Sequence, residues 1–120
     1  MKKRLVGVVV VVASALAAVS LAFAGCTTLK LDAAKASLAY NKKVLKAKAG
    51  KVTIVMTNMS AVFQHNVAIK GKGVSKKGKV VGKGGQSKVT ATLKPGTYTF
   101  YCTVPGHEAA GMKGKLIVTK

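Results

Sequence analysis

Short stretches in which apolar and polar residues alternate are the feature that most constrains the fold of this chain. In residues 51–57 the apolar side chains Val52, Ile54 and Met56 occupy every second position. A period of two is typical of a β-strand that buries one face, whereas an amphipathic helix would repeat about every 3.6 residues. Comparable runs cover residues 65–69, 88–93, 97–102 and 115–119.

Turn-forming dipeptides separate these runs. The pairs are Ala-Gly at 49–50 and Pro-Gly at 95–96 and 105–106. With a first strand at 29–31 and a looser segment at 38–48, the chain would hold about seven strands, a number typical of a sandwich. We therefore predict an all-β fold, a Greek-key β-sandwich preceded by an apolar N-terminal segment.

Two segments carry weaker patterns. Residues 33–40 could form one or two turns of helix. Residues 71–85 are rich in glycine and lysine, a composition typical of a flexible, solvated loop. Val74, Val80 and Val81 interrupt this composition, so a short edge strand is expected inside it. Lysines along such an edge would discourage edge-to-edge association.

The N-terminus has the pattern of an export signal. Lys2, Lys3 and Arg4 precede an uncharged stretch that runs from residue 5 to residue 29. A basic start followed by an apolar run and small residues is typical of a segment that directs export. We predict a signal segment at residues 1–25 and a mature domain at residues 26–120.

Phe23-Ala-Gly-Cys26 closes the apolar run and resembles a bacterial lipobox, which implies that Cys26 is lipidated and becomes the mature N-terminus. Such motifs usually carry Leu where this chain has Phe23. Two alternatives stay open: an uncleaved anchor, because about 20 apolar residues span a bilayer, and ordinary cleavage near Ala24. Each of the three places the domain outside the cytoplasm, in the periplasm or at the cell surface, and the first two tether it to the membrane.

The charge is strongly basic. Lys and Arg number 21 against 2 acidic residues, a net charge of +19. Removal of residues 1–25 would leave 18 lysines and a net charge of +16. Such a charge suggests nucleic acid, an anionic membrane or an acidic protein as partner. Arg4 is the only arginine, and lysine lacks the planar fork that reads guanine edges, so no specific nucleic-acid binding is expected. The role of the lysine-rich segment 70–88 stays open.

One loop carries the chemistry. Cys102, His107 and Met112 follow one another with the spacing C-x4-H-x4-M. The chain has one other histidine, His65, which heads a separate predicted strand. Two imidazoles, a thiolate and a thioether suit a mononuclear copper site that transfers electrons. Because Cys26 would carry the lipid, Cys102 has no expected disulfide partner, and a metal is its natural occupant.

Other interpretations of these residues are weaker. Structural zinc sites usually take two or more cysteines and have no use for methionine. A catalytic Cys–His pair would need a third, orienting residue, and none is evident. We therefore predict that the protein is not an enzyme.

The segment 101–118, together with His65 upstream, resembles the cupredoxin family of blue copper proteins, in particular its plastocyanin, azurin and auracyanin types. The resemblance extends over residues 28–120 and implies a β-sandwich. It also implies that His65, Cys102 and His107 form a trigonal plane around one copper ion. Met112 would then be the weak axial ligand.

The resemblance implies further roles. Asn66 matches the family's Asn after the first histidine ligand, and it is expected to bond near Thr103 and to orient the site. The backbone carbonyl of Gln64 stands where some azurin-like members have a distant fifth contact. Tyr101 resembles a surface aromatic that serves as a second docking site, although a plain edge aromatic is an equal alternative. An apolar patch around His107 would form the main electron-transfer surface, from Ala61, Val62, Pro105, Ala109 and Ala110.

The predicted function is therefore a small exported type 1 copper protein, a monomer that shuttles single electrons between redox partners through Cu(I)/Cu(II). The charge favours an acidic redox protein as partner. Two alternatives stay open. One is an envelope protein that holds and delivers Cu(I) without redox cycling, and the other is a polycationic surface adhesin for which copper is incidental.

Overall fold

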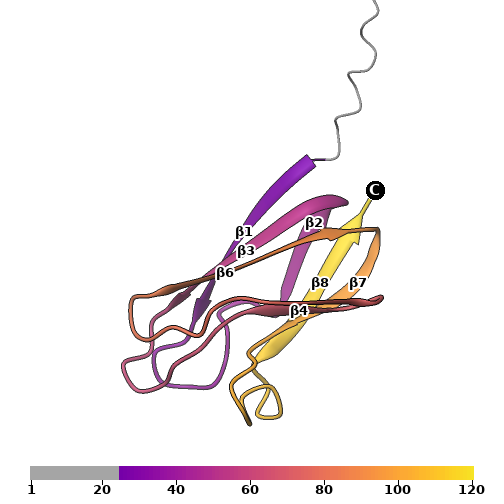
Figure 1. Cartoon of the computed structure of the whole chain (residues 1–120). Coiled ribbons are helices and arrows are strands. Elements are labelled where there is room, and N and C mark those ends of the chain that lie inside the picture. The colour runs from indigo at the N-terminus through magenta and orange to yellow at the C-terminus, as the bar shows by residue number, and fades with distance from the viewer. Residues whose placement is uncertain (1–24) are drawn as a thin grey trace, which may run out of the picture.

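The computed structural model describes residues 25–120, and the predicted signal segment 1–25 lies outside them except for its last residue. The described residues form eight strands (Figure 1). The strands are β1 (Gly25–Ala33), β2 (Val44–Lys48), β3 (Gly50–Asn58), β4 (Ala68–Gly71), β5 (Val74–Lys77), β6 (Gln86–Leu93), β7 (Gly96–Tyr101) and β8 (Lys113–Thr119).

The strands make two sheets. One has the order β1-β3-β6 and the other the order β2-β8-β7-β4-β5. Within them β1 runs parallel to β3 and β2 parallel to β8, while the other neighbours are antiparallel. The all-β sandwich is confirmed, with eight strands rather than about seven. The first strand is longer than the expected 29–31, because β1 keeps its register with β3 over all nine of its residues.

The core lies between the sheets and follows the alternation in the sequence. In β3 the even-numbered residues from Val52 to Asn58 are buried and the odd-numbered ones are more exposed. Phe100 of β7 is fully buried and packs against the Tyr40 ring at a centroid distance of 5.6 Å. The buried apolar side chains include Leu31, Val52, Ile54, Met56, Ile69, Val89, Leu93, Tyr98, Phe100 and Leu116.

Two local expectations were wrong. Residues 35–38 form a series of bends, and the predicted helical turns within 33–40 are absent. Hydrogen bonds between Asp32 and Asn41, and from Ala34 N–H to the Ala39 carbonyl, close this segment as a loop between β1 and β2. His65 does not lie in a strand, because β4 begins only at Ala68.

The lysine-rich segment contains the expected edge strand. Its strand β5 pairs only with β4 and forms one edge of the five-stranded sheet. Lys76 and Lys77 on this edge are exposed, which disfavours pairing with another chain. Among residues 25–120, no helix is long and apolar enough to cross a membrane.

Candidate metal centre

Three potential ligand atoms converge at one end of the sandwich. The Nδ1 atoms of His65 and His107 lie 3.2 Å apart, and Cys102 Sγ lies 3.9 Å from the first and 3.6 Å from the second. All three side chains are buried, with exposures of 0 %, 8 % and 1 % for His65, His107 and Cys102. This triangle is the one group of three or more potential His, Cys, Asp or Glu ligands in the described part of the chain.

The triangle has the dimensions of a three-coordinate metal site. Histidine nitrogen binds zinc at about 2.0 Å and cysteine sulfur at about 2.3 Å. A trigonal plane with these bond lengths has an N–N edge of about 3.5 Å and S–N edges of about 3.7 Å. The observed edges of 3.2, 3.6 and 3.9 Å are close to these values. The side chains therefore fit a single ion, and the mixed imidazole and thiolate donors suit copper.

The loop after β7 brings two of these ligands together. Cys102 directly follows β7, and its N–H donates to the Met112 carbonyl at 3.2 Å. The Met112 N–H in turn donates to the His107 carbonyl at 3.0 Å. Gly106 and Gly111 adopt positive φ angles of 84° and 107°, which residues with a side chain rarely adopt. The loop folds back on itself, so that the fully buried Met112 lies beside Cys102.

The other histidine is fixed by a bridge to a distant segment. His65 exchanges two main-chain hydrogen bonds with Val81, one in each direction. Its ring is fully buried, and its Nε2 atom has no hydrogen-bond partner among the described residues. The ring is therefore held by its backbone and by packing, with Nδ1 directed at Cys102 and His107.

Asn66 connects the two ligand segments. Its Nδ2 donates to Thr103 Oγ1 at 2.9 Å, and its Oδ1 accepts from the Thr103 N–H at 2.8 Å. The same Nδ2 donates to the Gly78 carbonyl at 2.9 Å. Since Asn66 follows His65 and Thr103 follows Cys102, these bonds fix the distance between the two ligand segments.

Tyr40 supports this connection, a role that no pattern in the sequence predicted. Its hydroxyl donates to the Asn66 carbonyl at 2.6 Å. Burial, and next the negative charge of a Cys102 thiolate, raise the pKa of Tyr40 far above its ordinary value of 10.0, so the hydroxyl remains a donor. Tyr40 stands in a segment without regular alternation, and its one signal in the sequence was that it is an aromatic residue.

Phe63 was also missed, and it lies against both histidines. Its ring centroid is 6.1 Å from that of His65 and 6.0 Å from that of His107. The loop that carries it is fixed by Asn58, whose Nδ2 donates to the Phe63 carbonyl, and by Ser60, whose Oγ accepts from the Phe63 N–H. Phe63 is 38 % exposed and Val62 is 77 % exposed, so this loop adds apolar surface next to the histidines.

The predicted apolar patch lies beside the same ligands. Pro105, Ala109 and Ala110 are exposed on the loop that carries His107, and Ala61 is exposed on the loop of Phe63. His107 itself retains 8 % exposure within this surface. The ligand with the largest remaining exposure thus lies among exposed apolar residues.

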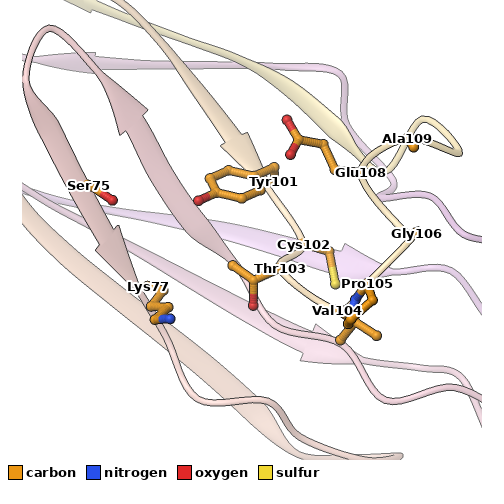
Figure 2. Close-up of a pocket in the computed structure, with 10 residues that line it drawn as sticks. All are labelled: Ser75, Lys77, Tyr101, Cys102, Thr103, Val104, Pro105, Gly106, Glu108 and Ala109. Carbon is orange, nitrogen blue, oxygen red and sulfur yellow. The ribbon is translucent and has the colours of Figure 1, made fainter.

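Tyr101 lines a cleft beside the ligand loop, as Figure 2 shows. The cleft has a volume of about 510 Å³ and is also lined by Lys77, Pro105 and Glu108. Lys70 Nζ lies 4.2 Å from the Tyr101 ring centroid and forms an ion pair of 2.6 Å with Glu108. The pair covers part of Tyr101 and attaches the ligand loop to β4.

The two remaining candidate residues are exposed. Gln64 is exposed, and a contact from its carbonyl to a metal remains a prediction. Cys26 is exposed near the start of β1, and both it and Cys102 are free thiols.

The copper-free protein should lose stability as the pH falls. Burial, and next the positive charge of His107, hold the pKa of His65 below its ordinary value of 6.5. Below about pH 6.5 the unfolded chain therefore binds a proton that folded His65 does not bind. The free energy of unfolding should decrease by up to about 1.4 kcal/mol per pH unit until folded His65 is also protonated. Urea unfolding between about pH 7.5 and pH 5 measures this, and His65→Gln should flatten the profile.

One family model and several solved structures are similar to this chain. A family model described as "Copper binding proteins, plastocyanin/azurin family" matches residues 27–119. Auracyanin A, a "blue" copper protein from the green thermophilic photosynthetic bacterium Chloroflexus aurantiacus, is 31 % identical, with a TM-score of 0.70 over 79 % of this chain and 100 % of that one. Dithionite-reduced auracyanin from Roseiflexus castenholzii is 30 % identical, with a TM-score of 0.68 over 78 % and 97 % of the two chains.

A shorter stretch is more similar still. Auracyanin-B of Chloroflexus aurantiacus is 64 % identical to this chain over 28 residues. That stretch spans 23 % of this chain and 12 % of the relative.

Proposed function

Because the chain belongs to the plastocyanin/azurin family of copper-binding proteins, we propose that it is a type 1 copper protein. We propose further that it is exported and carries single electrons between redox partners. His65, Cys102 and His107 would hold the ion, together with the thioether of Met112. Copper bound there supplies the one-electron couple Cu(I)/Cu(II). Thiolate and thioether suit the reduced ion and imidazole accommodates the oxidised one.

The observation that carries this proposal is the buried triangle of two imidazole nitrogens and one sulfur, with all three atoms within 4.8 Å of one another. With Met112 as a fourth ligand, the protein would supply the full coordination and would leave no open position for a substrate. Asn66 and Tyr40 hold the ligand segments in place from outside. A rigid and closed site of this kind suits electron transfer better than bond-making chemistry.

Electrons enter and leave near His107. This ligand retains 8 % exposure, and Phe63, Pro105 and the two alanines after Glu108 surround it with apolar surface. An apolar surface permits close approach and a short, weak encounter, as redox exchange requires. Tyr101 next to Cys102 offers a second contact, through the cleft in Figure 2.

The site of action is outside the cytoplasm. The basic start and the uncharged run to residue 29 support export, and Cys26 after Phe23-Ala-Gly supports lipidation and a membrane tether. The mass of the mature chain tests this point. If Cys26 is lipidated and is the first residue, the mass should equal that of residues 26–120 plus the lipid, whereas an intact Met1 would contradict the proposal. Loss of processing in globomycin would identify the lipoprotein route.

The electron-transfer function is tested by loading purified protein with Cu(II). An intense visible thiolate-to-copper band, bleached by reductant and restored by oxidant over repeated cycles with copper retained, is the expected result. A folded and loaded sample without the band would refute the proposal. Release of copper on each reduction would instead indicate a copper-delivery protein.

The rate of electron transfer should depend on the charge of the partner. The domain from residue 26 onward carries a net charge of +16. An anionic redox reagent should therefore react at least about tenfold faster than a cationic one of equal driving force at low salt. Added salt should remove the difference, because screening shortens the range of these charges. Stopped-flow kinetics over a salt series measures both rates.

Two matched double variants would locate this effect. Lys35 and Lys83 line a pocket with Met59 and Ala61, at the metal end. Lys51 and Lys94 lie at the opposite end, since Lys51 pairs with Thr92 near the start of β3. Lys35→Gln/Lys83→Gln should slow the anionic reagent more than Lys51→Gln/Lys94→Gln does. If both double variants slow the anionic reagent equally, electrons do not enter preferentially at the metal end.

A further inference from the structure

The end of the sandwich opposite the metal centre carries a group of five lysines, here called the basic end. Register places Gly25, Gly50 and Leu93 side by side at this end. In the five-stranded sheet, the pairs Lys48–Thr119 and Gly96–Val118 lie at the same end. Lys48 is two residues before Gly50, and Gly96 is three residues after Leu93. Figure 1 shows the start of β1, the β6–β7 turn and the C-terminus at this end, and the loop between β7 and β8 at the other. The basic end comprises the exposed residues Lys48, Lys51, Lys72, Lys94 and Lys120.

Lys72 belongs to this group through a close contact. A Cβ atom added to Gly96 would lie 2.6 Å from Lys72 Cδ, so the Lys72 side chain lies across the start of β7. Lys48 Nζ donates to the main-chain oxygen of Lys120 at 3.3 Å, which brings two more members together. The lysines therefore surround one end of the molecule.

The basic end contains no acidic side chain. The chain has only two, Asp32 and Glu108. Asp32 pairs with Thr57 near the far end of β1, and Glu108 follows His107 in the ligand loop. Both carboxylates thus lie towards the metal end, where Glu108 also neutralises Lys70. The metal end also carries exposed lysines, such as Lys35, Lys83 and Lys113. The two ends therefore differ in their acidic side chains, which lie only towards the metal end.

The chain also enters the domain at the basic end. β1 begins there at Gly25, and the sequence before it is uncharged back to residue 5. We propose that the basic end lies on an anionic lipid surface and so holds the metal centre on the side of the domain that faces away from the membrane. This inference depends on the strand register and the lysine positions, not on the metal chemistry.

A lipid surface fits these lysines better than an acidic protein does. Five point charges at five separate strand ends match a diffuse layer of headgroups, whereas a specific protein partner would need a shaped contact. An uncharged run of about 20 residues is long enough for a bilayer, and it joins the domain next to these lysines.

The basic end and the metal end are far enough apart for membrane attraction at one and partner docking at the other to be independent. The nine residues of β3 rise by about 3.3 Å each, so the metal end lies about 30 Å from the basic end. Screening in physiological salt acts over about 8 Å. Charge at the lipid surface therefore has little effect on a partner that docks at His107.

The test is lysine footprinting of the full chain in nanodiscs, made either of phosphatidylcholine alone or with added phosphatidylglycerol. An amine-reactive reagent and mass spectrometry report the reactivity of each lysine. Added phosphatidylglycerol should protect Lys48, Lys51 and Lys94, and high salt should remove the protection. Lys35 and Lys83 at the metal end should react equally in both discs and serve as internal controls.

Charge-removing variants sharpen the test. Each lysine near an anionic surface is worth about a fivefold change in the docking equilibrium. Lys51→Gln/Lys94→Gln should therefore weaken the protection of Lys48 by about 25-fold at a given lipid charge, and Lys35→Gln/Lys83→Gln should leave it unchanged. Equal reactivity of the basic end in both discs would overturn the proposal. So would protection that appears only when an acidic protein is added, because that result assigns this end to a protein partner.

Discussion

Cys102→Ala should abolish the visible band of the copper-loaded protein while the sandwich remains folded. Cys102 Sγ lies 3.9 Å and 3.6 Å from the two histidine Nδ1 atoms and is the only thiol near them. The intensity of such a band comes from the thiolate, so a site of two histidines and one methionine should be nearly colourless. Titration with Cu(II), followed by visible and EPR spectra, measures the loss.

The chain offers a matched control for this variant. The chain has one other cysteine, Cys26, which is exposed near the start of β1, at the end of the sandwich opposite the metal centre. Cys26→Ala should keep the full band and the same reduction potential. Far-UV circular dichroism should show β structure in both variants, because alanine replaces one small buried side chain at Cys102 and one small exposed side chain at Cys26. A band that survives in Cys102→Ala, or one that disappears in Cys26→Ala, would refute the ligand assignment.

Local patterns in the sequence predicted the sandwich and the composition of the metal centre. Alternation in 51–57 and 97–102 is a local property, and it led to strands that the structure contains. Cys102, His107 and Met112 stand on one short loop, so their spacing alone indicated that they could meet.

The features that hold the site in place could not be predicted in the same way. Tyr40 lies 26 residues before its acceptor at Asn66, and Lys70 lies 38 residues before Glu108. No local periodicity reports such contacts, because they form only when the sheets pack. His65 was assigned to a strand for a related reason. Alternation in 65–69 looked like a strand, whereas residues 65–69 are all buried and only the last of them lie in β4.

Asn66→Ala should have the second large effect, because this side chain connects the two ligand segments. Asn66 is fully buried, and its side chain makes three hydrogen bonds, two with Thr103 and one with Gly78. Each buried group left without a partner costs about 1–3 kcal/mol. The free energy of unfolding should therefore fall by about 3 kcal/mol or more, a large part of the total stability of a small domain.

The effect of Asn66→Ala should extend to the metal, and this separates a positioning role from a purely structural one. Without these bonds the segments of His65 and Cys102 are free to move apart, so the band should shift and weaken and copper should exchange faster. Leu93→Ala is the control, since Leu93 is 2 % exposed at the basic end and its loss costs about 2–5 kcal/mol. Urea unfolding compares the stabilities, and the visible spectrum compares the sites. If both variants lose similar stability and keep the same band and copper exchange rate, Asn66 contributes to folding alone. If only Asn66→Ala changes the spectrum, its bonds to Thr103 set the geometry of the ligands.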